Sequence, residues 1–249
     1  MDIHLPRPAH GWHEFADEIA IISIGVMIGL GGEQLVEAIR DHQTARETLD
    51  TLRDELQDGL GSLQLRKMAE PCVDRRLGEV RALLYAWHRT GRFATPRWVS
   101  QAPMIWVSLA RYDAAVSAGR ISLLSNERQY RIGSTARALK QFERVQESEM
   151  MAWSKLRLLE AGPDALSSSD RTMILGSLQE ASALNYSAKR LIRQTLASTA
   201  NYGLHPDLSR FRPEASNIWR SGRYAPSICI SIKTPSDRAN KNQVVPLPQ

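Results

Sequence analysis

Histidines and carboxylates are the side chains in this sequence from which a metal site or an acid–base catalyst could be built. His10 and His13 could supply two metal ligands, but no cysteine or carboxylate is spaced to complete a site with them. A di-iron bundle would need Glu-x-x-His motifs on facing helices, and the residues three before the later histidines are Ile39, Tyr85 and Tyr202. We therefore predict no metal ligand and interpret the histidine pair as lying at the level of lipid headgroups.

Motifs of nucleophilic and phosphate chemistry are also missing from the sequence. It has no Gly-x-Ser-x-Gly elbow, no phosphate loop and no His-Glu-x-x-His. Glu18 stands at the edge of an apolar run, where a carboxylate could act in a proton relay. We interpret it instead as an interfacial anchor. The sequence thus predicts no catalytic residue and no cofactor, and a non-enzymatic protein.

The two cysteines, Cys72 and Cys229, belong to no CxxC motif or Cys/His cluster, so a structural zinc site is not predicted. Two cysteines do not define the redox compartment, and the sequence leaves open whether they pair. Cys229 lies in a segment expected to be poorly ordered.

The stretch Glu18–Arg40 decides the class of protein and has two interpretations. As a strand followed by the turn "GLGGEQ" it would resemble a dinucleotide-binding motif, which needs glycine at its first, third and sixth positions. Counted from Gly29, the sixth position is Gln34, and helix after helix follows in place of a second strand. The alternative is a hydrophobic helix, either buried in a core or crossing a membrane.

The membrane interpretation has a length problem. The uninterrupted apolar run Ile19–Gly32 has 14 residues, about 21 Å of helix against a hydrocarbon core of about 30 Å. The apolar face continues through Leu35 to Ile39, and Trp12 and Phe15 stand where an interfacial aromatic belt would lie. On these grounds the membrane helix and the buried core helix are nearly balanced.

The rest of the sequence is predicted to be helical. Leucines at heptad spacing, among them Leu49, Leu56 and Leu63, indicate a long amphipathic helix. Pro71 is expected to start a new helix, and another is expected from about Trp98 to Ala118. Two further long helices are expected after it, and connectors join the successive helices. The fold class is therefore all-α: a membrane helix continuing into a bundle of about five helices, whose core is expected to include Trp87, Trp98, Trp106 and Trp153.

Charge and composition define the two ends of the chain. The net charge is +5, and residues 203–249 carry seven basic and three acidic residues. This tail is predicted to be flexible and solvated rather than to bind nucleic acid, although residues 228–232 could pair briefly as a strand. The predicted organisation is a leader at 1–17, a transmembrane helix at 18–39, a helical bundle at 40–202 and a flexible basic tail at 203–249.

A resemblance to a protein family favours the membrane helix over the buried core helix for the stretch Glu18–Arg40. The stretch "LPRPAHGWHEFADEIAIISIGVMIGLGGEQLVE" resembles the start of an uncharacterised bacterial family of single-span proteins, and its matching positions are Glu18, Gly25, Ile28, Gly29 and Leu30. A second patch, Tyr112–Glu127, is similar to that family's bend between two helices. The resemblance implies an N-terminal membrane helix followed by a helical domain, although the leader here is acidic rather than basic.

Gly25, Gly29 and Gly32 would lie on one face of this helix, where a GxxxG pattern lets two membrane helices approach closely and dimerise. Glycine is also common in membrane helices that do not dimerise, so both interpretations stay open. If a dimer forms, the heptad helix is expected to continue the contact outside the bilayer.

Location and role follow from these predictions. The flanking arginines alone slightly favour a cytoplasmic domain, whereas the resemblance implies the bacterial inner membrane with the domain in the periplasm, and we predict the latter. The expected partners are the lipid bilayer, a second copy of the chain and an unidentified protein. The predicted function is a membrane-anchored interaction or assembly protein, and the alternative is a periplasmic sensor-like bundle that binds a small molecule between helices.

Overall fold

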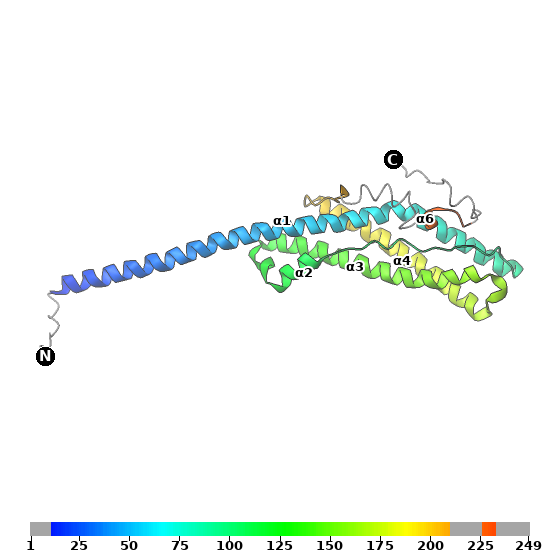
Figure 1. The fold of residues 1–249 in the computed structure, drawn as a ribbon, viewed down its shortest axis with the longest axis horizontal. Helices are drawn as coiled ribbons and strands as arrows, with labels where there is room; N and C mark the ends of the chain where they lie inside the picture. The colour runs from blue at the N-terminus through cyan, green and yellow to red at the C-terminus, as the bar shows by residue number, and fades with distance from the viewer. Residues whose placement is uncertain (1–10, 210–225, 233–249) are drawn as a thin grey trace.

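A single helix of 80 residues, α1 (Gly11–Thr90), runs from a protruding N-terminal half into a bundle with two other long helices (Figure 1). At 1.5 Å per residue it is about 120 Å long. The computed structural model describes residues 11–209 and 226–232; for residues 11–14 and 226–227 it describes the backbone alone. The described ranges contain helices and turns and no strand, so the predicted all-α class is confirmed.

The bundle consists of α1, α3 (Asn126–Leu156) and α4 (Ser168–Ala200). Shorter elements are α2 (Ala110–Ser117) and α6 (Pro226–Cys229), with 3-10 turns at Arg120–Leu123, Arg157–Ala161 and Pro163–Ala165. An extended connector leads from the end of α1 back along the bundle, so that α3 runs parallel to α1 and α4 runs antiparallel to both (Figure 1). A capping box of Ser167 and Asp170 starts α4.

Pro71 lies inside α1 and does not start a new helix, contrary to the prediction. A proline in a helix interior costs about 3 kcal/mol or more, because it removes a backbone hydrogen bond and crowds the preceding turn. The apolar residues on both sides of it are buried in the same bundle, among them Leu60, Leu63, Val73 and Leu77. This packing offsets the local cost and keeps the two halves in one helix.

The helix predicted from Trp98 is also wrong in extent, because residues 91–109 are not helical and α2 begins only at Ala110. Pro96 and Pro103 disfavour helical geometry at the residues that precede them. The connector is instead held by side chains of the bundle: Gln146 pairs with both the N–H and the C=O of Ile105. Trp106, predicted to be in the core, is 69% exposed, whereas Trp87 and Trp153 are buried.

The core has two apolar clusters. The one nearer the N-terminal end of the bundle includes Leu56 and Leu60 of α1, Leu139 of α3 and Ile192 of α4. The other includes Leu77 of α1, Trp153 of α3 and Leu178 of α4. Between the two clusters the same three helices contribute polar side chains, which form the layer described below.

Candidate functional site

The first part of α1 has no cover within the described chain. Residues 15–43 are all exposed, and Ile21, Met27, Ile28, Leu35 and Val36 each expose more than 60% of their surface. Within the described residues, α1 contains a stretch long and apolar enough to cross a membrane, by length and composition, and none of that stretch is buried. Ile19 to Leu30 are therefore not part of this chain's core, which was the alternative that the sequence left open.

The predicted helix-packing glycines lie on this exposed part of α1. Gly25, Gly29 and Gly32 follow one another at steps of four and three, which place them on one helix face. A Cβ atom added at any of them would meet nothing within 4 Å. Continuing the same steps, Ile22 precedes the three glycines and Val36 follows them, so this face carries no side chain between two β-branched residues.

Of the predicted interfacial anchors, Phe15 and Glu18 are exposed residues of α1. Trp12 lies in the first turn of α1, but its side chain is outside the described ones, as is that of His13, and His10 precedes the described residues. The flexible tail predicted from residue 203 also falls largely outside the described residues.

A polar layer crosses the bundle between the two apolar clusters. Arg66 of α1 donates from Nη2 to both carboxylate oxygens of Glu149 of α3, at 3.0 and 3.1 Å, and to Asn185 of α4, at 3.2 Å. All three side chains are excluded from solvent. Asn185 in turn donates to Asp74, whose other oxygen accepts from Lys189. The layer thus ties the three long helices together in one register.

This layer is not fully satisfied. Nε and Nη1 of Arg66 and Oε1 of Glu70 have no hydrogen-bond partner among the described residues, although all three atoms are buried. Burial raises the pKa of Glu70 above its ordinary value, and the attraction of Lys189 and Arg66 only partly offsets this. Glu70 is therefore a carboxyl group that favours its neutral form more than a solvated glutamate does.

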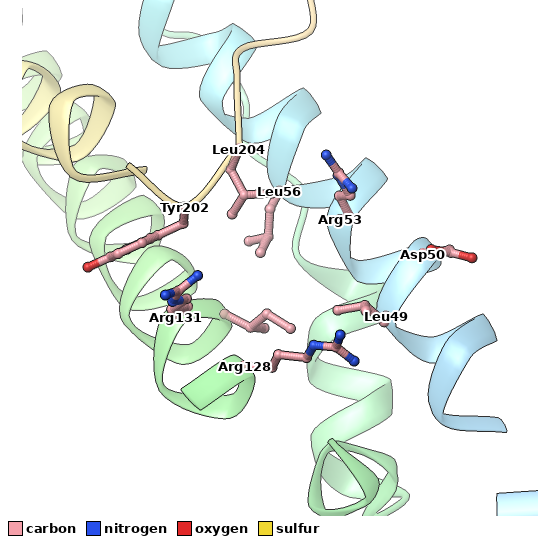
Figure 2. Close-up of a pocket in the computed structure, with 9 residues that line it drawn as sticks. Leu49, Asp50, Arg53, Leu56, Arg128, Arg131, Tyr202 and Leu204 are labelled. Carbon is pink, nitrogen blue, oxygen red and sulfur yellow. The ribbon is translucent and has the colours of Figure 1, made fainter. Parts of the chain in front are cut away.

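A pocket of about 220 Å³ opens at the N-terminal end of the bundle (Figure 2). Four of its lining residues come from α1, three from the first two turns of α3, and two from the segment that follows α4. Its polar lining consists of Arg53, Arg128, Arg131, Asp50 and the ring of Tyr202, and its apolar lining consists of Leu49, Leu56, Ile132 and Leu204.

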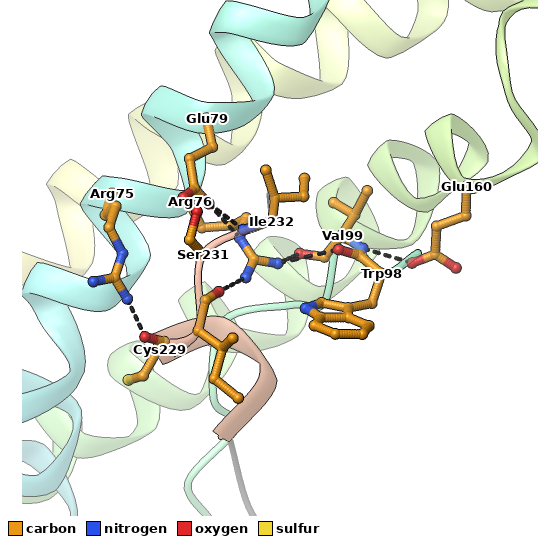
Figure 3. Close-up of polar contacts among 10 residues, drawn as sticks. Arg75, Arg76, Glu79, Trp98, Val99, Glu160, Cys229, Ser231 and Ile232 are labelled. Carbon is orange, nitrogen blue, oxygen red and sulfur yellow. Dashed lines mark hydrogen bonds and ion pairs between the residues drawn. The ribbon is translucent and has the colours of Figure 1, made fainter. Parts of the chain in front are cut away.

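The segment 226–232 is held against α1, although it lies in the tail that the sequence predicts to be flexible. Cys229 forms a disulfide with Cys72 of α1. The buried guanidinium of Arg76 donates to the carbonyl oxygens of Ile230 and Val99, and Glu79 accepts from Ser231 at 2.6 Å and from the N–H of Ile232 at 3.2 Å (Figure 3). Residues 228–232 therefore pack as a short helix end and a turn, not as a strand.

The described residues contain no group of three or more histidine, cysteine, aspartate or glutamate side chains that could hold a metal ion. The buried polar side chains are accounted for mainly by contacts that join helices to one another or to the connector. Such contacts position the helices and the connector relative to one another.

Sequence reasoning missed the polar layer and the pocket. Arg66, Glu149 and Asn185 stand in amphipathic patterns where polar residues normally face solvent, and their burial depends on how three helices cross. The arginines of the pocket come from two helices far apart in sequence. No protein-family model, curated protein or solved structure matches the chain.

Proposed function

We propose that this protein is a membrane-anchored, non-enzymatic interaction or assembly protein of a bacterial inner membrane. The observation that carries this proposal is the exposure of every apolar side chain between Ile19 and Ile39 on a helix that continues into the bundle. Exposed apolar patches of this extent are rare in soluble monomers and mark surfaces that a membrane or a partner covers.

The length of the exposed helix favours the membrane as the cover. Residues 15–43 form about 43 Å of helix, more than the hydrocarbon thickness of about 30 Å. The helix can therefore extend on both sides of the short apolar run. Glu18 and Glu33 are about 22 Å apart along its axis, so their side chains would have to reach outward toward the headgroups. A helix crossing lipid satisfies its own backbone hydrogen bonds, so no further element is needed.

The glycine face suits a second copy of the chain as a partner within the bilayer. Gly25, Gly29 and Gly32 leave the backbone accessible, and close backbone approach is what stabilises helix pairs in lipid. The heptad leucines were expected to continue this contact outside the bilayer, but Leu52 and Leu56 are buried within the chain's own bundle and are not accessible to a second copy. A homodimer would thus be joined at the anchor.

The disulfide supports placing the bundle outside the inner membrane, in the periplasm. Disulfides form and persist in oxidising compartments and are rare in the cytosol. The bond between Cys72 and Cys229 closes a separation of 157 residues and joins the C-terminal segment to α1. We propose this orientation in agreement with the single-span family that the N-terminus resembles.

Alkaline carbonate extraction tests the anchor. Full-length protein expressed in bacteria should stay in the membrane fraction, and a variant lacking residues 1–34 should be extracted. Protease added to spheroplasts should then digest the bundle of the full-length protein. Extraction of the full-length protein as freely as the truncation would overturn the anchor, and protection of the bundle in spheroplasts would overturn the orientation.

Cross-linking in native membranes tests the dimer. Gly25→Leu with Gly29→Leu should abolish a cross-linked dimer, because two large side chains would separate the helices. Gly31→Leu is the matched control, since Gly31 is equally exposed but lies off the glycine face. A dimer that survives the double substitution, or is lost equally with Gly31→Leu, would contradict this interface.

The second candidate function is a sensor-like bundle that binds a small molecule between helices. The pocket between α1, α3 and the segment after α4 favours it, because it brings charged and apolar side chains together in one concavity. The two functions are compatible, since an anchored bundle can also bind a ligand.

A further inference from the structure

The lining of the pocket has two chemically different parts. Its apolar part is formed by Leu49 and Leu56 of α1, Ile132 of α3 and Leu204. Its polar part contains the three guanidinium groups of Arg53, Arg128 and Arg131, which come from two helices, as Figure 2 shows. A ligand that fits both parts must itself have an apolar body and an acceptor group.

The charge of the pocket is only partly neutralised by the protein. Arg131 pairs with Glu127, and Asp50 contributes one negative charge to the lining. Arg128 and Arg53 form no ion pair with any residue in the described ranges, and Arg53 donates one hydrogen bond to the carbonyl oxygen of Gly203. A positive excess therefore remains, and it favours an anion.

Two of the arginine groups are held in place before any ligand arrives. The guanidinium carbon of Arg131 lies 4.6 Å from the ring centroid of Tyr202, a cation–π contact. Arg53 is held by its bond to Gly203, at 3.2 Å. Arg53 and Arg131 are thus ordered in advance and lose less freedom when they bind a ligand.

Arg128 lies in the first turn of α3, where the positive end of the helix dipole also attracts an anion.

We infer that this pocket binds a small organic anion with an apolar body, such as a medium-chain carboxylate or a phosphate monoester. Guanidinium groups recognise both acceptors through paired N–H donors. The volume of about 220 Å³ is below the roughly 300–1,000 Å³ of sites for drug-sized ligands, so the ligand is small. The apolar lining distinguishes it from an inorganic anion, which would leave those side chains uncovered.

Headgroups of the anchoring bilayer are a poor source for this anion. Arg53 is 14 residues beyond Ile39, which places it about 21 Å along α1 from the end of the predicted span. The headgroup region adds only about 5–8 Å on each side of the hydrocarbon. The ligand is therefore a free molecule. This inference rests on the second candidate function. Only the exclusion of headgroups uses the predicted anchor, and nothing in it uses the dimer.

Calorimetric titration of the full chain in phosphatidylcholine nanodiscs tests the inference. The probes are octanoate and octyl phosphate, with octanol, acetate and inorganic phosphate as comparison compounds, and empty nanodiscs are subtracted. We expect octanoate and octyl phosphate to bind one site per chain. Arg128→Gln with Arg131→Gln should weaken binding by about tenfold or more, because charge-assisted hydrogen bonds are lost.

The matched control is Arg137→Gln, an exposed arginine that follows Arg128 by nine residues and so lies on the opposite face of α3. It should leave the affinity unchanged. If the double variant does not fold, Arg128→Gln alone serves, since Arg128 is exposed and has no ion pair in the described chain to lose.

Three results would overturn the inference. Octanol binding as tightly as octanoate would show that charge is not recognised. Inorganic phosphate binding as tightly as octyl phosphate would show that the apolar lining is not used. Binding of octanoate that disappears in nanodiscs containing phosphatidylglycerol would show that a lipid headgroup is the true occupant. Carbonate extraction of the same variants separates these results from a failure of the anchor.

Discussion

The guanidinium of Arg66 lies 3.0 Å from the carboxylate of Glu149 in the middle of the bundle, with both side chains excluded from solvent. The pair lies between two apolar clusters of the core. Without it, the helices could shift along one another by a turn and still bury apolar side chains. A buried ion pair contributes little net stability compared with apolar residues of the same size. Its value here is a defined register between α1, α3 and α4.

Removing one partner of this pair should destabilise the bundle strongly. Glu149→Ala is expected to lower the free energy of unfolding by about 3–5 kcal/mol, because it leaves a buried charge uncompensated. The double variant Arg66→Met with Glu149→Leu should lower the free energy of unfolding far less. Denaturant unfolding followed by tryptophan fluorescence measures both, and Glu147→Ala is the exposed control on the same helix. Equal losses for the single and the double variant would contradict this account.

Stability should depend on pH through Glu70. Its pKa is raised in the folded state by burial, so the folded protein binds the proton more tightly than the unfolded chain does. Its contribution to stability is therefore fully present below 4.5, the ordinary pKa of a glutamate, and is lost as pH rises through the folded pKa. We expect Glu70→Gln to gain stability relative to the wild type over that window. Parallel pH profiles for the two proteins would exclude this role.

Glu55 should be needed to hold α2. Its two carboxylate oxygens accept from the backbone N–H groups of Arg111 and Tyr112, at 2.9 and 2.8 Å, and its side chain is buried. Glu55→Ala leaves these N–H groups without their acceptor, at a cost of about 1–3 kcal/mol. Hydrogen exchange at Arg111 and Tyr112 should rise more than elsewhere. Asp54→Ala, an exposed neighbour, is the control. Unchanged exchange in Glu55→Ala would contradict this role of Glu55.

Reduction of the disulfide should release the C-terminal segment from α1. In the chain-entropy description, a bond that closes 157 residues stabilises the folded state by up to about 5 kcal/mol. Cys229→Ser should lower the denaturation midpoint and expose the segment around Ser231 to protease. Arg76 and Glu79 also hold this segment, so Cys229→Ser with Glu79→Ala should release it more completely. Identical protease patterns for the wild type, Cys229→Ser and the double variant would show that these contacts do not hold the segment against α1.

Much of the architecture could be predicted from local pattern. Leucine spacing at Leu49, Leu56 and Leu63 predicted the packed part of α1. The expected break at Pro71 and the expected helix from Trp98 were wrong because both depend on tertiary contacts. Packing against α3 and α4 keeps the helix intact at Pro71. The connector is held by Gln146, which pairs with the N–H and C=O of Ile105, and by Glu160, which accepts from the N–H of Val99.

The sequence by itself determined the helical class and the apolar N-terminal stretch with its glycine face, since hydrophobic periodicity and composition are local properties. Only the tertiary structure decided which polar residues are buried and which cysteines meet. Arg66, Glu149 and Asn185 become one layer, and Arg53 and Arg131 one pocket, because parallel and antiparallel helices bring together residues that are far apart in the sequence. Arg66 is 83 positions from Glu149 and 119 from Asn185. A one-dimensional pattern does not contain these distances.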